Sequence, residues 1–89
     1  MAEVIFTEGF MDDVHLVQRE EKLDEILDRI ALLKENPELG STLLPQSIRR
    51  RFGSHVRKLV VSPFDVIYEY LPQDDAVVVL GLIHQRAAQ

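Results

Sequence analysis

The chain contains no cysteine and no tryptophan, and among its 89 residues only four are glycine and four are proline. Without cysteine it can form neither a disulfide framework nor a thiolate metal site, on which secreted domains of this size commonly depend. The 46% hydrophobic and 28% charged residues are typical of an ordinary globular protein. We therefore expect a single folded domain, residues 1–89, in a reducing, cytoplasmic environment.

Long apolar runs and a basic leader are also missing. The first eight residues, MAEVIFTE, contain two acids and no lysine or arginine. No later stretch approaches the roughly 20 apolar residues that a membrane span needs. We therefore expect neither a targeting signal nor a membrane partner.

The histidines do not indicate a metal site. His15, His55 and His84 are widely separated, and no two of them have the spacing of metal ligands. We expect no metal and no other cofactor. A lone histidine at the end of a strand, such as His84, is more often a packed and hydrogen-bonded residue than a catalyst.

Basic residues are scarce in the first part of the chain and concentrated later. The net charge of −5 combines residues 1–38, with four Lys/Arg against eleven Asp/Glu (−7), and residues 39–89, with six against four (+2). Residues 48–58, IRRRFGSHVRK, contain five of these cations and no acid. A run of charge is usually just a solvated surface, but in so acidic a chain this segment is where we expect an anionic partner to bind.

Apolar periodicity predicts a strand and two helices in the first part of the chain. Residues 4–6 are a short apolar run followed by Thr7, a candidate N-cap. Helical spacing then joins Phe10, Val14 and Val17. A stronger stripe begins at residue 21 and contains Leu23, Ile26, Leu27, Ile30 and Leu33. This second helix should end near Asn36, because Pro37 disfavours the α conformation of the residue before it.

Residues 40–54 lack a clear period, so we predict a surface loop that presents the arginines. Three β-rich runs follow, at 55–61, 64–71 and 76–83. Their short connections require antiparallel pairing, and only the first strand is free to pair in parallel. The predicted fold is α+β with the order β-α-α-β-β-β, a helical hairpin packed on one face of a small, mainly antiparallel sheet. In the third predicted strand, the side toward the helices should carry Phe64, Val66, Tyr68 and Tyr70.

Several strings in this order resemble a known family over nearly the whole chain. They are Asn36-Pro37-Glu38-Leu39-Gly40, Val56-Arg57-Lys58-Leu59-Val60-Val61, Pro63-Phe64-Asp65-Val66-Ile67-Tyr68 and the segment from Val78 to Arg86. Together they are similar to the ParE/RelE superfamily of toxins from bacterial toxin–antitoxin modules. The resemblance implies a RelE/ParE-like fold and a cognate antitoxin that holds the protein inactive. It also implies one of two targets: RelE-like proteins cleave mRNA in the ribosomal A site without a metal, whereas ParE-like proteins poison DNA gyrase.

Two details make the chain more similar to the ParE branch. The closing Ile83-His84-Gln85-Arg86 with a very short tail is ParE-like. RelE-like nucleases tend to carry an arginine just before the Val-Ile-Tyr string, where this chain has Asp65, and a tyrosine near the C-terminus, whereas none follows Tyr70. A carboxylate at that position opposes the approach of a phosphate. The resemblance therefore implies inhibition by binding of a macromolecule such as DNA gyrase.

The candidate site residues follow from these readings. Target binding is expected of the basic residues Arg49, Arg50, Arg51, Arg57, Lys58 and Arg86. If the protein is instead RelE-like, metal-free cleavage of RNA needs an acid, a base and cations at the phosphorane. The catalytic residues would then be Arg57, His84 and Arg86, with Arg51 as a further phosphate contact. A third reading is a non-toxic, degenerate member that keeps only the fold and the antitoxin interface.

Two structural alternatives stay open at this stage. Arg57 shares its side of a strand with Leu59 and Val61, so it can simply lie across the sheet and pair with Glu69 or Asp65. The apolar residues of the first helix belong either to the core or to a partner's groove. An antitoxin strand or helix would cover such a surface, and in its absence a homodimer or poor solubility is expected.

Overall fold

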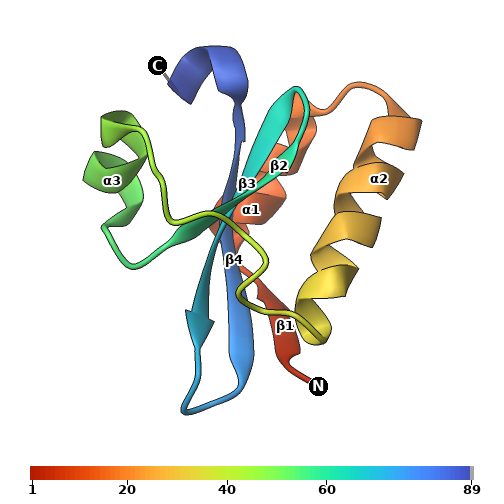
Figure 1. Ribbon diagram of the computed structural model, residues 1–89. Helices are drawn as coiled ribbons and strands as arrows, with labels where there is room; N and C mark the ends of the chain where they lie inside the picture. The colour runs from red at the N-terminus through yellow and green to blue at the C-terminus, as the bar shows by residue number, and fades with distance from the viewer. Residues whose placement is uncertain (89) are drawn as a thin grey trace.

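The computed structural model describes residues 1–88 (Figure 1). Its main elements, in chain order, are β1 (Glu3–Phe6), α1 (Glu8–Asp13), α2 (Glu20–Ala31), α3 (Gln46–Phe52), β2 (Arg57–Val61), β3 (Phe64–Leu71) and β4 (Ala76–His84). Single 3-10 turns follow α1, α2 and β4 at Val14–Leu16, Leu32–Lys34 and Gln85–Ala88.

The four strands form one sheet in the order β1-β4-β3-β2. β2, β3 and β4 are antiparallel to one another, as their short connections predicted. β1 lies at the edge beside β4 and runs parallel to it, with Phe6 opposite Val79. The predicted α+β class with a mainly antiparallel sheet is therefore confirmed, and the structure assigns the first strand to the β4 edge.

The larger core lies between α2 and one face of the sheet. It buries Ile26 and Ile30 of α2 and Leu33 of the 3-10 turn that follows α2. The sheet contributes Leu59, Val61, Phe64, Val66 and Tyr68, with Tyr70 packed at the margin. The predicted inward side of β3 is therefore confirmed. Burial of this amphipathic stripe, at about 25 cal/mol per Å² of apolar surface, is what holds α2 on the sheet.

The opposite face of the sheet is covered by α3, so that α2 and α3 lie on opposite sides of it in Figure 1. The prediction of a loop over residues 40–54 was wrong at this point. Ile48 and Phe52 are four residues apart and share one side of the helix, where Ile48 is buried with Ile67 and Ile83. A helix this short is stable only through such tertiary contacts. Its seven residues are too few to show a repeating apolar pattern in the sequence.

The two helices of the hairpin are unequal. Thr7 caps α1 as predicted, since its Oγ1 accepts a hydrogen bond from the Phe10 amide at 3.3 Å. However, α1 has only six residues, or about 9 Å of length, whereas α2 has twelve, or about 18 Å. α1 follows the edge of β4 beyond the end of β1, where Asp13 Oδ2 accepts a hydrogen bond from the Leu82 amide at 3.0 Å.

A bulge in β4 changes which face each of its side chains occupies. Ile67 is opposite Gly81 and Tyr68 is opposite Val79, so Leu80 has no cross-strand partner on β3. Leu82 consequently belongs to the α2 core, whereas Leu80 packs against the α3 core. Simple alternation would place Leu80, Leu82 and His84 on one side of the strand, whereas the bulge puts Leu80 on the other side. Uninterrupted alternation cannot anticipate an inserted residue.

Candidate functional site

α3 places its arginines according to its buried side. Ile48 points into the protein, so Arg50, two residues later, points away from the sheet. Arg49 and Arg50 are both exposed, and within residues 1–88 neither has a carboxylate partner. These two guanidinium groups are therefore free to meet an anionic surface.

Arg51 lies beside the buried side of α3 and is partly engaged. Its Nη2 is 3.9 Å from Asp13 Oδ2, and its guanidinium carbon lies 4.8 Å from the centre of the Phe52 ring. The side chain remains 60% exposed, so the ion pair contributes little to stability. Arg51 therefore ties α3 to α1 and is less available than its two neighbours.

Phe52 fits against Gly81 and thereby fixes the distance between α3 and the sheet. A Cβ at Gly81 would lie 2.8 Å from Phe52 Cζ and 3.1 Å from Asp13 Oδ2. Glycine at the β4 bulge therefore leaves room for an aromatic side chain of α3.

Arg57 lies on the α2 face of the sheet, away from the α3 arginines. Its Nη1 donates hydrogen bonds to the carbonyl oxygens of Gly40 at 2.9 Å and Glu38 at 3.2 Å, and its Nη2 is 3.3 Å from Glu38 Oε2. The predicted partners Glu69 and Asp65 were therefore wrong, because Arg57 reaches the segment after α2 and does not cross the sheet. Lys58, the next residue, alternates to the α3 face.

Tyr68 supports the same segment from beneath. Its hydroxyl donates to the Pro37 carbonyl oxygen at 2.8 Å and accepts from the Gly40 amide at 2.8 Å. Burial raises the pKa of this phenol above its ordinary value, so Tyr68 is neutral and structural at physiological pH. Its prediction as a core aromatic is confirmed, and the Asn-Pro-Glu-Leu-Gly string marks the backbone that it holds.

Asp65 is 3% exposed and its Oδ1 accepts a hydrogen bond from Gln85 Nε2 at 3.2 Å. This carboxylate links β3 to the turn after β4 and does not face solvent. It therefore fixes the C-terminal turn from which Arg86 extends.

Of the three residues assigned to the nuclease alternative, His84 and Arg86 lie together, but Arg57 lies far from both. Arg57 is in the cross-strand row of Tyr68, whereas His84 is in the row of Phe64, two strands away. Four residues along and two strands across correspond to about 16 Å between their Cα atoms. His84 packs edge-on against Phe64, with 5.4 Å between ring centres, and its Nδ1 accepts the Arg86 amide proton at 3.2 Å.

The basic residues expected to bind the target therefore do not form a single surface. The α3 face carries Arg49, Arg50, Arg51 and, from β2, Lys58. Arg57 is on the other face, and Arg86 is exposed in the turn after β4. Proximity in sequence suggested one surface, but strand alternation between Arg57 and Lys58 separates them.

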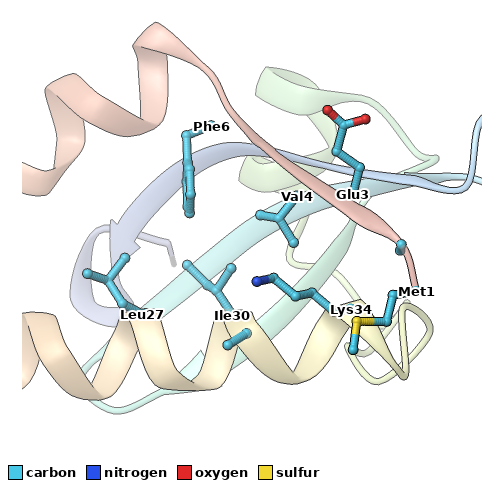
Figure 2. Close-up of a pocket in the computed structure, with 9 residues that line it drawn as sticks. Met1, Glu3, Val4, Phe6, Leu27, Ile30 and Lys34 are labelled. Carbon is cyan, nitrogen blue, oxygen red and sulfur yellow. The ribbon is translucent and has the colours of Figure 1, made fainter.

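A second surface, which the sequence reading missed, is an apolar groove between β1 and α2 (Figure 2). Val4 and Phe6 of β1 face Leu27 and Ile30 of α2 across a space of about 460 Å³. The groove is not closed over, since Phe6 is 44% and Leu27 is 40% exposed. The available signal was the combination of a short strand, which leaves an open sheet edge, with Leu27 at the margin of the α2 stripe.

Among residues 1–88, no group of three or more histidines and acids is arranged to hold a metal ion. No helix within the described residues is long and apolar enough to cross a membrane.

The fold matches chains of solved toxin–antitoxin complexes. A chain of the RelBE2 complex from Mycobacterium tuberculosis superimposes with a TM-score of 0.74 at 20% identity, covering 93% of this chain and 90% of that one. A chain of the intact RelBE complex of E. coli gives 0.66 at 13% identity, covering 92% and 94%. The architecture is thus that of RelE/ParE-like proteins.

The sequence itself identifies the family. Residues 4–88 match the model of the ParE toxin of the type II toxin–antitoxin system parDE. The search of curated proteins returned no match. The chain belongs to the ParE toxin family of type II toxin–antitoxin systems.

Proposed function

We propose that this protein inhibits growth by binding a macromolecular target such as DNA gyrase, and that a cognate antitoxin neutralises it. Membership of the ParE toxin family supports the general role. The observation that carries binding, in preference to bond cleavage, is the separation of Arg57 from His84 by two strands and four residues. Acid–base catalysis needs its groups within hydrogen-bond reach of one substrate, and these groups point to different parts of the molecule.

The α3 face is the proposed target-binding surface. Arg49 and Arg50 present two fixed charges that form no ion pair within residues 1–88, Lys58 adds a third from β2, and Arg51 is partly available. A protein target with an acidic groove suits this arrangement, because guanidinium groups bind carboxylates in pairs of hydrogen bonds. Free nucleic acid suits it less, since the net charge of −5 opposes the broad electrostatic attraction on which that binding depends.

The test is expression of the chain without its antitoxin. Growth should stop, and gyrase-dependent DNA breaks should accumulate while translation continues. Arrest of translation with intact DNA supercoiling would reject gyrase as the target. Normal growth with soluble, folded protein would instead support the degenerate, non-toxic reading.

A RelE-like endonuclease is the alternative, supported by the structural likeness to chains of two RelBE complexes. His84 and Arg86 are adjacent at the end of β4, and with Arg57 they would have to act on different parts of a long mRNA. Primer extension on translated messages decides between the two. Cleavage that is lost in folded His84→Ala and Arg86→Ala variants would establish the nuclease and overturn the binding proposal.

A further inference from the structure

The apolar groove between β1 and α2 can accommodate one more helix. α1 is too short to lie beside α2 along its length. Among residues 1–88, no second helix therefore covers β1 on the face of the sheet that α2 occupies. Figure 2 shows Val4 and Phe6 on one wall and Leu27 and Ile30 on the other, with Lys34 at one end. The lining extends from Leu27 to Lys34, which is about 10 Å or two helical turns.

The outer margin of this groove carries a row of uncompensated negative charge. Asp24 and Asp28 lie three residues before Leu27 and Ala31, two of the groove residues, and therefore on the same side of α2. Glu20 precedes Asp24 by four residues, so the three carboxylates follow one another at successive turns. All three are exposed, and among residues 1–88 none has a lysine or arginine partner.

Like charges spaced four residues apart destabilise a helix by a few tenths of a kcal/mol per pair. On another side of the same helix a lysine compensates an acid, since Lys22 Nζ lies 2.7 Å from Glu25 Oε1. On the groove side the repulsion is left in place. A partner that brings cations would relieve it.

We propose that the groove binds an amphipathic helix of the antitoxin whose apolar stripe contacts Phe6 and Leu27 and whose lysines or arginines face Glu20, Asp24 and Asp28. This inference rests on the proposed function, since it assigns the antitoxin to this groove. A second copy of the chain is a poor occupant, because its longest helix has the same acidic margin and would be repelled. A cationic helix satisfies both the apolar lining and the charge.

The groove can be tested with two synthetic probes. Both are amphipathic helical peptides of about 16 residues with the same leucine stripe, one flanked by lysine and the other by glutamate. The wild-type chain should bind the lysine peptide about tenfold more tightly than the glutamate peptide, as measured by fluorescence anisotropy, and added salt should reduce the difference. Asp24→Lys/Asp28→Lys should reverse the preference.

The matched control is Asp12→Lys/Asp74→Lys, which changes the net charge equally at exposed positions outside α2 and outside the groove lining. It should keep the preference for the lysine peptide. Leu27→Asp should weaken both peptides, and circular dichroism checks that each variant is folded. Equal binding of the two peptides, binding of neither, or reversal by the control as well would each overturn the proposal. A wild-type dimer in sedimentation that Leu27→Asp dissolves would also overturn it, because the groove would then hold a second copy.

A growth assay connects the groove to the antitoxin. In cells that co-express the cognate antitoxin, Asp24→Lys/Asp28→Lys should escape neutralisation and arrest growth, whereas Asp12→Lys/Asp74→Lys should stay neutralised. Neutralisation of both variants would overturn the assignment of the antitoxin to this groove. The peptide measurements do not depend on toxicity, so a chain that binds the lysine peptide but never arrests growth contradicts the proposed function alone.

Discussion

The guanidinium group of Arg57 donates a hydrogen bond to the carbonyl oxygen of Gly40 at 2.9 Å, across 17 residues of sequence. With the second bond to the Glu38 carbonyl oxygen, this contact fixes the segment that joins α2 to α3. Arg57 therefore has a structural role. Loss of toxicity on mutation of Arg57 would by itself say nothing about the target.

Arg57→Ala should lower the free energy of unfolding by about 1–2 kcal/mol, because it leaves two carbonyl oxygens without a charged donor. Urea denaturation measures this change. Arg29→Ala, which removes an exposed arginine that forms no ion pair within residues 1–88, should change the stability by less than about 0.5 kcal/mol. Equal stability of Arg57→Ala and wild type would contradict the structural role.

Tyr68→Phe should cost about 2 kcal/mol at neutral pH, since it leaves the Gly40 amide and the Pro37 carbonyl oxygen without their partner. The effect of pH has a definite sign. Because the pKa of Tyr68 is raised in the folded state above the ordinary value of 10.0, the folded chain keeps a proton that the unfolded chain releases. Stability from this group is therefore complete below pH 10 and falls as the pH rises above it.

Denaturation of wild type and Tyr68→Phe between neutral and alkaline pH tests this sign. The loss of stability above pH 10 should be shallower in the variant, which has no phenol to ionise at this position. A steeper loss in the variant would show that the phenol of Tyr68 does not cause the alkaline decline.

Gly81→Ala should destabilise the chain by about 1–3 kcal/mol, because the new methyl group would overlap the Phe52 ring. Phe52→Ala alone should also destabilise it by removing ring contacts with the sheet. Combined with Phe52→Ala, the Gly81→Ala change should cost much less than it does alone, since the cavity left by the ring accepts the methyl group. Strict additivity in this double-mutant cycle would contradict the contact between α3 and the bulge.

Arg49→Glu/Arg50→Glu should abolish growth inhibition while the free energy of unfolding stays within about 0.5 kcal/mol of wild type, because both side chains are exposed and neither forms an ion pair in the described part of the chain. Arg19→Glu/Arg29→Glu provides the same change of charge on the other side of the molecule and should remain toxic. Growth curves and thermal unfolding give the two readouts. Full toxicity of the α3 variant would remove α3 from the target-binding surface.

The elements with a sustained pattern were predictable from the sequence. The α2 stripe repeats over about three turns, and the β3 alternation from Phe64 to Tyr70 matches the buried side that the structure shows. The short connections left the last three strands no choice but antiparallel pairing. Over these segments each residue's burial follows from its neighbours in sequence, so a periodic pattern is sufficient.

The site was less predictable because its geometry depends on contacts between distant segments. α3 is stabilised by the packing of Ile48 and Phe52 on the sheet. Their contacts are Ile67, Ile83 and Gly81, which lie up to 35 residues away in the sequence. One inserted residue at Leu80 moved the later side chains of β4 to the other face.

The sequence by itself determined the order of the four strands, α1 and α2 along the chain, the acidic first part and the arginine-rich segment. Each of these is a property of neighbouring residues. Only the tertiary structure decided that Arg57 holds a loop while Arg49 and Arg50 are free, and that β1 and α2 leave a groove between them. Such features depend on which segments meet in space, and that is set by burial of the whole apolar surface at once.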